Sequence, residues 1–393
     1  MKKVRLGDIA TVITKGTTPT TLGYDFVDDG INFVKIESIT ENGEFLTDKF
    51  AHITEECDRK LSRSQLQRND LLFSIAGAIG RTAIVTDDIL PANTNQALAI
   101  IRVPEGVVDY SYLKHVLQSP NIVEQFEKKK QGVAQLNISL KDIGDFVMPL
   151  RTAEEQKSIV ATMDKVSGLI ALRKEQLAKL DQLVKSRFIE LFGDCLTNPK
   201  GWKTKHLEDI AEVGSSKRVF VEELKEVGIP FYRGTEVGAL AEGKPITPEL
   251  FITEEHYAEL CEATGTPRIG DLLMPSICPD GRIWVVNSDD PFYFKDGRVL
   301  WVHNIDASYN SIFLLYTLKD RIMTDYSSIA SGTTFAELKI FALKKCRVFD
   351  VPLGMQNDFA AFIEQTDKSK LAIQQSLDKL ETLKKSLMQE YFG

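Results

Sequence analysis

The sequence lacks any apolar run close to the ~18–20 residues that a membrane-spanning helix needs. Its start, "MKKVRLGDIA", lacks the apolar core of a secretory signal peptide. The five cysteines are scattered, odd in number and include no C-x-x-C pair, so neither a disulfide framework nor a structural zinc site is supported. These absences predict a soluble, cytoplasmic protein whose thiols are reduced and mostly structural.

The chain also lacks a positive net charge and the common catalytic motifs. Its formal net charge is −8, which argues against a protein that coats nucleic acid by electrostatics alone, although local basic surfaces remain compatible. There is no G-x-G-x-x-G or H-E-x-x-H order, and the five histidines are isolated. The segment "DDPFYF" at 289–294 echoes the Asp-Pro-Pro-Tyr motif of amino-methyltransferases, but Phe292 replaces the second proline. No catalytic residue and no metal ligand is predicted.

Internal repetition is what the sequence does contain. The phrase "KSRFIELFG" at 185–193 returns as "KSLMQEYFG" at 385–393. Matched positions include Asp8 with Asp209 and Asp70 with Asp271 at an offset of 201, and Leu177, Leu180 and Leu183 with Leu377, Leu380 and Leu383 at an offset of 200. Because each unit is far longer than a solenoid repeat, we expect two copies of one domain.

Each copy begins with a mixed pattern. In the first copy, "INFVKIESI", "DLLFSIAG", "RTAIVTD" and "ALAIIRV" are short apolar or alternating runs typical of strands, broken by turn-forming residues. The segment "YSYLKHVLQSPNIVEQFEKKK" at 110–130 predicts a helix. The predicted fold class is therefore α+β, with two tandem mixed α/β domains.

Each copy ends in a long helical pattern. Thr152 and Glu155 have the spacing of a capping box, and apolar residues then recur at a period near 3.5 from Ile159 to Leu191. The second copy has comparable spacing from Phe359 to Tyr391. A single such helix could pack on its own domain. Two similar ones, each too long for its domain, favour an antiparallel coiled-coil spacer with pseudo-two-fold symmetry.

These features together resemble a known family. The tandem plan, the "DLL" strand before "IGRTAIV", the stretch "NTNQALAI" and the run "VMPLRTAEEQKSIV" at the start of a long helix are similar to the specificity (S) subunit of Type I restriction-modification enzymes. The resemblance covers nearly the whole chain. It implies target recognition domains at 1–150 and 194–353, and long spacer helices at 151–193 and 354–393.

The resemblance also implies a function. Such a subunit is non-catalytic, recognises a bipartite double-stranded DNA target, and docks two modification subunits that bind S-adenosylmethionine and methylate adenine. Restriction subunits are possible further partners, and no cofactor is expected in this chain. The exposed coiled-coil surface and the "FG" helix ends are the predicted interface. Two alternatives remain: a self-contained DNA methyltransferase, and a scaffold whose coiled coil joins domains that do not bind DNA.

Side-chain chemistry indicates the candidate DNA-binding residues, because amides pair with adenine while Lys and Arg suit guanine or phosphate. They are Lys15, Thr17, Thr18, Lys35, Arg81, Asn93, Asn95 and Gln96 in the first copy, and Ser216, Lys217, Arg218, Arg233, Arg282, Lys295, Asp296 and Arg298 in the second. Arg81 and Arg282 follow a glycine at a strand boundary, which also suits a surface charge or a stabilising ion pair. Asn93 and Asn95 flank a turn, where Asn is common for backbone reasons.

The candidate contact residues differ between the copies although the pattern of elements repeats. "KGTTPTTLGYDF" faces "GSSKRVFVEELK", and "LPANTNQALAI" faces "PFYFKDGRVLWV". We therefore expect an asymmetric, interrupted target with half-sites about one helical turn apart, centre to centre.

Overall fold

The computed structural model describes residues 2–128, 137–332 and 336–393. The chain divides into two units, one formed by residues 1–175 with 374–393 and the other by residues 176–373. Each unit therefore contains the start of one long helix and the end of the other. Within the described residues, no helix is both long and apolar enough to cross a membrane.

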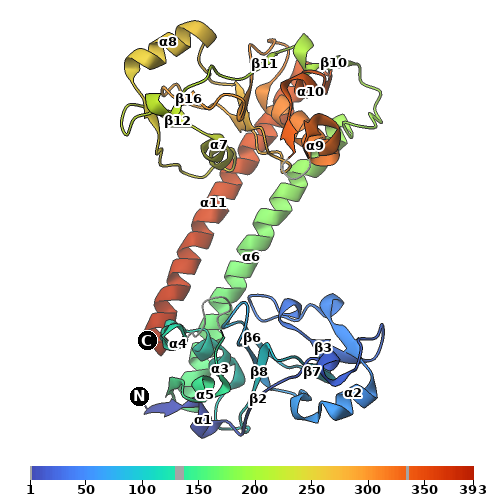
Figure 1. Ribbon diagram of the computed structural model, residues 1–393, viewed down its shortest axis with the longest axis vertical. Coiled ribbons are helices and arrows are strands. Elements are labelled where there is room, and N and C mark those ends of the chain that lie inside the picture. Colours follow the sequence, from blue (N-terminus) through green and yellow to red (C-terminus); the bar gives the residue numbers. More distant parts are fainter. Residues whose placement is uncertain (1, 129–136, 333–335) are drawn as a thin grey trace. The chain divides into compact units, whose positions relative to one another are not determined.

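The described residues of the first unit form three small sheets, and Figure 1 labels strands of two of them. A four-stranded antiparallel sheet has the order β2 (Val12–Lys15), β8 (Leu98–Arg102), β5 (Leu71–Ser74), β6 (Thr82–Ile84). A three-stranded sheet has the order β4 (Ala51–Ile53), β3 (Ile31–Val34), β7 (Ala92–Thr94), in which β3 pairs antiparallel with β4 and parallel with β7. The third pairs β1 (Lys2–Arg5) with β9 (Val147–Leu150).

The second unit repeats this topology. Its four-stranded sheet has the order β11 (Glu212–Gly214), β17 (Val299–His303), β14 (Leu272–Pro275), β15 (Trp284–Val285). Its other sheets are β13 (Phe251–Ile252), β12 (Ile229–Tyr232), β16 (Tyr293–Phe294), the pair β10 (Thr204–His206) with β20 (Arg347–Phe349), and the added pair β18 (Ala330–Ser331) with β19 (Glu337–Leu338). Here β12 again has one antiparallel and one parallel neighbour. The prediction of a duplicated mixed α/β fold is confirmed.

Short helices flank the sheets in both units. They are α1 (Leu6–Ile9), α2 (Glu55–Lys60), α3 (Tyr110–Leu117), α4 (Pro120–Glu127) and α5 (Leu140–Gly144) in the first, and α7 (Gly234–Ala241), α8 (Glu254–Thr264), α9 (Ser311–Ile329) and α10 (Ile340–Lys344) in the second. The single helix expected at 110–130 is wrong. Ser119 caps a new helix at Pro120, whose missing N–H is harmless at a helix start but would break a helix interior. Residues 129 and 130 lie outside the described residues.

The two long helices are α6 (Ala153–Phe192) and α11 (Leu353–Phe392). The expected capping box is present, because the Thr152 N–H donates to the Glu155 carboxylate at 2.9 Å and the Glu155 N–H donates to the Thr152 hydroxyl at 3.3 Å. In the first unit Lys174 lies 3.1 Å from Glu381, and in the second Lys370 lies 2.6 Å from Asp181. The start of each helix thus lies beside the end of the other, which confirms the predicted antiparallel pair.

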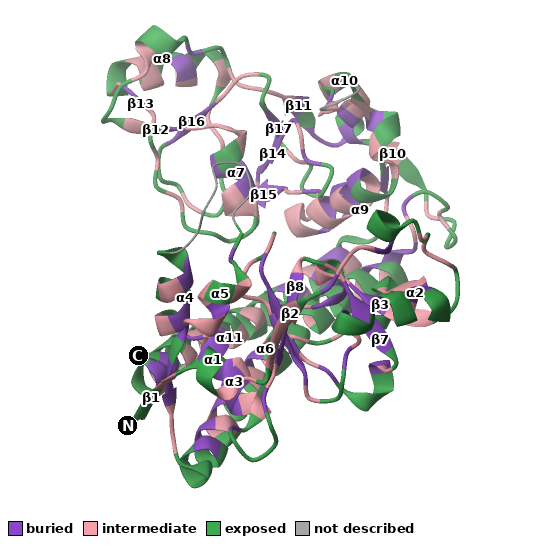
Figure 2. Ribbon diagram, turned by 60° about the horizontal axis from the view of Figure 1, so that its bottom comes forward, coloured by how far each residue is buried: buried purple, intermediate pink, exposed green. Residues whose placement is uncertain are grey.

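The core of each unit is closed by the end of a long helix. In the first unit Phe392 is 0% exposed, and its ring centroid lies 5.5 Å from that of Tyr112. In the second, Phe192 is also 0% exposed and lies 4.8 Å from Phe313. Strands β8 and β17 are buried along most of their length (Figure 2), and alternate residues of each strand belong to these cores. The repeated phrase near 193 and 393 therefore supplies the same core aromatic twice, and these rings are not the exposed interface residues expected of the "FG" ends.

A buried glutamine fixes the start of each long helix. The Gln156 side chain accepts from the Asp109 N–H at 2.8 Å and donates to the Arg151 carbonyl at 2.9 Å. Gln356, 200 positions later, accepts from the Asn310 N–H at 2.8 Å and donates to the Val351 carbonyl at 2.9 Å. Since Asp109 and Asn310 are the N-caps of α3 and α9, each long helix is tied to the start of an earlier helix of the same unit.

Phe192→Ala and Phe392→Ala should destabilise different units. Each removes a fully buried ring, which costs about 3–5 kcal/mol of unfolding free energy. All three tryptophans, at 202, 284 and 301, belong to the second unit. Phe192→Ala should therefore lower the urea midpoint followed by tryptophan fluorescence, while Phe392→Ala should act mainly on the midpoint followed by far-UV circular dichroism. Leu183→Ala, at a residue 49% exposed, is the control and should change neither. Equal shifts of the fluorescence midpoint in both phenylalanine variants would contradict this assignment.

Candidate nucleic-acid interface

Five of the eight candidates in the first unit lie together where the loop after β2 meets the loop between β7 and β8. They are Lys15, Thr17, Thr18, Asn95 and Gln96. The Gly16 N–H donates to the Asn95 carbonyl at 3.1 Å, and the Thr18 hydroxyl is hydrogen-bonded to the Gln96 side chain. A Cβ on Gly16 would lie 1.7 Å from the Thr94 carbonyl oxygen, so only glycine allows this approach. We name these five residues the first loop cluster.

The other three candidates of the first unit have partners inside the fold. Asn93 is 0% exposed, and its amide donates to the Asp58 carboxylate at 2.8 Å and to the Leu61 carbonyl at 3.2 Å. The Arg81 guanidinium donates to the Ile39 carbonyl at 2.7 Å. The Lys35 ammonium lies 4.3 Å from the centre of the Phe26 ring. Asn93 and Arg81 therefore hold loops of the domain in place, while the first loop cluster brings exposed Lys15 and Gln96 together with the half-buried Thr17, Thr18 and Asn95.

Four cationic candidates of the second unit line a single pocket of about 570 Å³. They are Arg233, Arg282, Lys295 and Arg298, which come from three separate stretches of sequence. The apolar part of the lining includes Val221, Leu224, Phe231, Leu250, Pro275 and Ile277. We name this site the basic pocket. Its combination of an apolar surface with several guanidinium and ammonium groups suits a ligand that carries both flat apolar parts and anionic groups.

Carboxylates position the cations of the basic pocket. Arg233 lies 2.6 Å from Glu236 and 3.0 Å from Glu249, Arg282 lies 2.8 Å from Asp280, and Arg298 is paired with Glu337. Burial by itself raises the pKa of Glu236, but hydrogen bonds from the Arg233 side chain and from backbone N–H groups outweigh it and lower the pKa to about 2. The pairs hold the guanidinium groups in fixed positions. They also explain how a basic site is compatible with an acidic chain.

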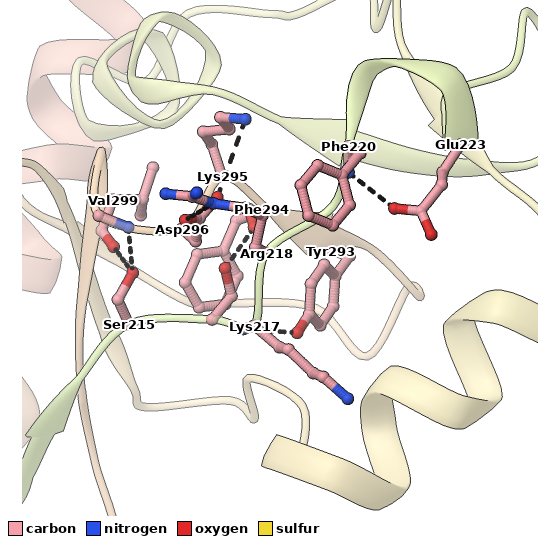
Figure 3. A network of polar contacts seen from close by, with 12 residues as sticks. Ser215, Lys217, Arg218, Phe220, Glu223, Tyr293, Phe294, Lys295, Asp296 and Val299 are labelled. Atoms are coloured by element: carbon pink, nitrogen blue, oxygen red, sulfur yellow. Dashed lines mark hydrogen bonds and ion pairs between the residues drawn. The ribbon is translucent and has the colours of Figure 1, made fainter.

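The remaining candidates of the second unit are Ser216, Lys217, Arg218 and Asp296, and Figure 3 shows Arg218 and Asp296 beside Lys295 of the pocket. The Ser216 hydroxyl donates to the Phe294 carbonyl at 2.6 Å, and the Lys217 N–H donates to the Tyr293 hydroxyl at 2.9 Å. Arg218 donates to the Asp296 carboxylate at 3.1 Å, and Lys295 lies 3.8 Å from the same carboxylate. Asp296 thus links the loop after β11 to the basic pocket, so all eight candidates of the second unit lie in one connected region.

The residues that position this region are not among the candidates that the sequence pattern indicates. Glu236 and Glu249 hold Arg233, and Tyr293 holds the backbone of Lys217. The sequence contains one indication of the Glu236 role, because Arg233 precedes Glu236 by three residues, the spacing of a capping box. In the structure the Arg233 N–H donates to the Glu236 carboxylate at 2.7 Å at the start of α7. Across residues 2–128, 137–332 and 336–393, no three His, Cys, Asp or Glu side chains are grouped so as to hold a metal ion.

Most of the chain matches a known protein family. Residues 1–182 and 199–384 match the family described as Type I restriction modification DNA specificity domain. The specificity subunit of the Type I restriction enzyme EcoBI from Escherichia coli is 30% identical over 207 residues, which cover 51% of this chain and 42% of that subunit. The specificity subunit of the MjaIX enzyme from Methanocaldococcus jannaschii is 23% identical over 390 residues, which cover 93% of this chain and 85% of the relative.

Two solved structures share the fold. One is a chain of a type I R-M system studied for complex assembly and conformational transition, with a TM-score of 0.61 and 20% identity over 99% of this chain and 97% of that chain. The other is the S subunit of a Type-I restriction-modification system from M. genitalium, with a TM-score of 0.55 and 14% identity over 100% of this chain and 96% of the other. At such identities the likeness shows the fold alone.

Glu236→Gln should reduce the stability of the second unit in a pH-dependent way. The folded-state pKa of Glu236 lies below its ordinary value of 4.5, so its ionised form stabilises the fold fully above about pH 5 and progressively less as the pH falls toward 2. We expect a loss of about 1–3 kcal/mol at pH 7, with the difference from the wild type shrinking between pH 5 and 3. Urea titrations followed by tryptophan fluorescence measure it. A difference that stays constant over this range would show that the ion pair with Arg233 is not its source.

Proposed function

Because the chain belongs to the family of Type I restriction-modification DNA specificity subunits, a non-catalytic family, we propose that each of its two units binds one half of a bipartite duplex target. One observation carries this proposal. The two units have the same strand order, yet the same loop presents Thr17 and Thr18 in the first unit and Lys217 and Arg218 in the second. Similar frameworks with different contact chemistry suit different half-sites.

The two sites suit different kinds of contact with DNA. The first loop cluster offers hydroxyl and amide groups, which hydrogen-bond to base edges and have no net charge apart from Lys15. The second unit offers guanidinium and ammonium groups, which bind guanine edges or phosphates. We therefore propose an asymmetric target, in which the second unit supplies the larger salt-dependent part of the binding free energy.

We propose that α6 and α11 act as the spacer between the two half-sites. Each is 40 residues long, and each contributes to the cores of both units through its two ends. Such a helix pair would restrict the distance between the two half-sites. We expect this distance to be about one turn of the DNA helix, centre to centre. The domain limits implied by this view are 1–150 and 194–353 for target recognition, with 151–193 and 354–393 for the spacer.

We also propose that two modification subunits dock on the helix pair. Leu183 and Leu383 occupy matching positions 200 residues apart and are 49% and 46% exposed. Exposed leucines repeated at matching positions suit two equivalent contacts with two copies of one partner. S-adenosylmethionine would be bound by those partners, which methylate adenine.

The first test is DNA binding by the chain assembled with its modification subunits. Methylation-sensitive sequencing of the host genome, with and without this gene, identifies the target. Filter binding should then show preference for that duplex and a steep salt dependence. Arg282→Gln and Lys295→Gln should each lower the salt slope by about 1 if the cation contacts a phosphate. Lys368→Gln, an exposed lysine paired with Glu364 on α11, is the matched control. Equal binding to all duplexes would refute specific recognition.

The second test is the composition of the assembly. Native mass measurement should find two modification subunits per chain. Leu183→Asp and Leu383→Asp should each remove one of them, because a buried unpaired carboxylate is costly at an interface, and the double variant should remove both. Both residues are exposed, so the fold of the free chain should tolerate the changes. A wild-type assembly with one modification subunit contradicts the proposal.

A further inference from the structure

Two adjacent apolar side chains are exposed at the edge of the basic pocket. Phe220 is 54% exposed and Val221 is 78% exposed, and Val221 lines the pocket itself. A single exposed apolar residue is ordinary in a folded protein. Phe220 and Val221 are neighbours at the tip of a loop, beside a pocket that is lined by four cationic side chains. This arrangement favours a ligand that contacts both the apolar tip and the basic pocket.

The tip is held rigidly (Figure 3). A 3-10 helix, Val221–Glu223, follows Phe220, whose N–H donates to the Glu223 carboxylate at 2.7 Å. On one side of the tip Val219 is 1% exposed, and on the other the Lys225 N–H donates to the Phe251 carbonyl at 2.8 Å. A tip fixed on both sides loses little conformational entropy when it binds.

The charged residues around the tip favour phosphate groups at the basic pocket and uncharged bases at the tip. Arg218 precedes the tip, and the guanidinium and ammonium groups of the basic pocket lie next to Val221. Glu222 follows Val221 and is exposed, and a carboxylate there repels phosphates. The pocket therefore suits the phosphate backbone, while the tip suits the uncharged faces of stacked bases.

The first unit also has a 3-10 helix with an exposed apolar residue at the matching position. Its 3-10 helix, Pro19–Leu22, follows β2 as Val221–Glu223 follows β11. Leu22 at its end is 50% exposed, whereas Pro19 at its start is buried. Gly23 then adopts a positive φ of 79°, which turns the chain away. A rigid turn with an exposed apolar tip is thus present in both copies although their sequences differ there.

We propose that Phe220 and Val221 in the second unit, and Leu22 in the first, are apolar wedges that enter the DNA duplex between stacked base pairs. This inference rests on the proposed function and specifies how the duplex is held. Insertion of an apolar side chain unstacks a base step and kinks the duplex, at a cost that is lowest for flexible pyrimidine–purine steps. The wedges would therefore select such a step within each half-site without hydrogen-bonding to its bases.

The experiment uses the full chain assembled with its modification subunits and the target duplex found by methylation sequencing. 2-Aminopurine, whose fluorescence rises on unstacking, replaces one base at a time, excluding the adenine that is methylated. We expect a rise at one step of each half-site. The variant Phe220→Ser with Val221→Ser should abolish the rise in the second half-site only and weaken target binding by at least about tenfold. Leu22→Ser should abolish the rise in the first half-site only.

Two controls separate a wedge from a general surface effect. Phe220→Leu with Val221→Ile keeps the apolar volume and should preserve both the fluorescence rise and the affinity. Phe341→Ser changes a residue that is 73% exposed on α10 in the same unit and should alter neither. Because all the changed side chains are exposed, urea midpoints should stay close to that of the wild type.

The outcomes distinguish this inference from the function on which it rests. If the assembly prefers its target but no step gains fluorescence, or if the serine variant keeps the rise, the wedge is refuted and the proposed function stands. If the serine variant keeps the rise and instead loses a modification subunit, the tip is a protein contact and the wedge is again refuted. If the wild-type assembly prefers no duplex, both proposals fail.

Discussion

The fold depends on two buried aromatic contacts at the ends of the long helices. Phe392 completes the core around Tyr112, and Phe192 completes the core around Phe313. Helix α6 begins against the first core and ends in the second, and α11 runs the other way. The same hydrophobic burial that stabilises each unit therefore also joins it to the helix pair, which cannot separate from either unit without opening a core.

Duplication of this framework leaves the loops free to differ. The strand order is the same in both units, while the loop after the first strand of the four-stranded sheet carries neutral hydroxyl groups in one and cations in the other. In the second unit Asp296 pairs with Arg218 of this loop and Glu236 pairs with Arg233 of the basic pocket, so the proposed DNA-binding site is compatible with a net charge of −8. Preorganised cations contribute specificity more than bulk attraction, because the paired carboxylates cancel much of the long-range field.

Periodicity and repetition predicted the larger features, since both are properties of the sequence order itself. The antiparallel helix pair and the duplicated α/β domains follow from apolar spacing and the offset of about 200 residues. Residue type alone could not show that Asn93 is buried against Asp58, nor that Arg81 donates to the Ile39 carbonyl. It also could not show that Arg233, Arg282, Lys295 and Arg298 share a pocket, because that grouping depends on how distant loops meet.

The closure of the first core by Phe392 has a consequence for biosynthesis. Residues 1–175 leave the ribosome long before residues 374–393, which belong to the same unit. The surface around Tyr112 therefore stays uncovered until residues 374–393 have been translated, and a nascent chain in this state exposes apolar side chains to chaperones and to other chains. If translation stopped within α11, both domains would be present in the chain. The first domain, although translated earlier, would lack the residues of α11 that complete its core.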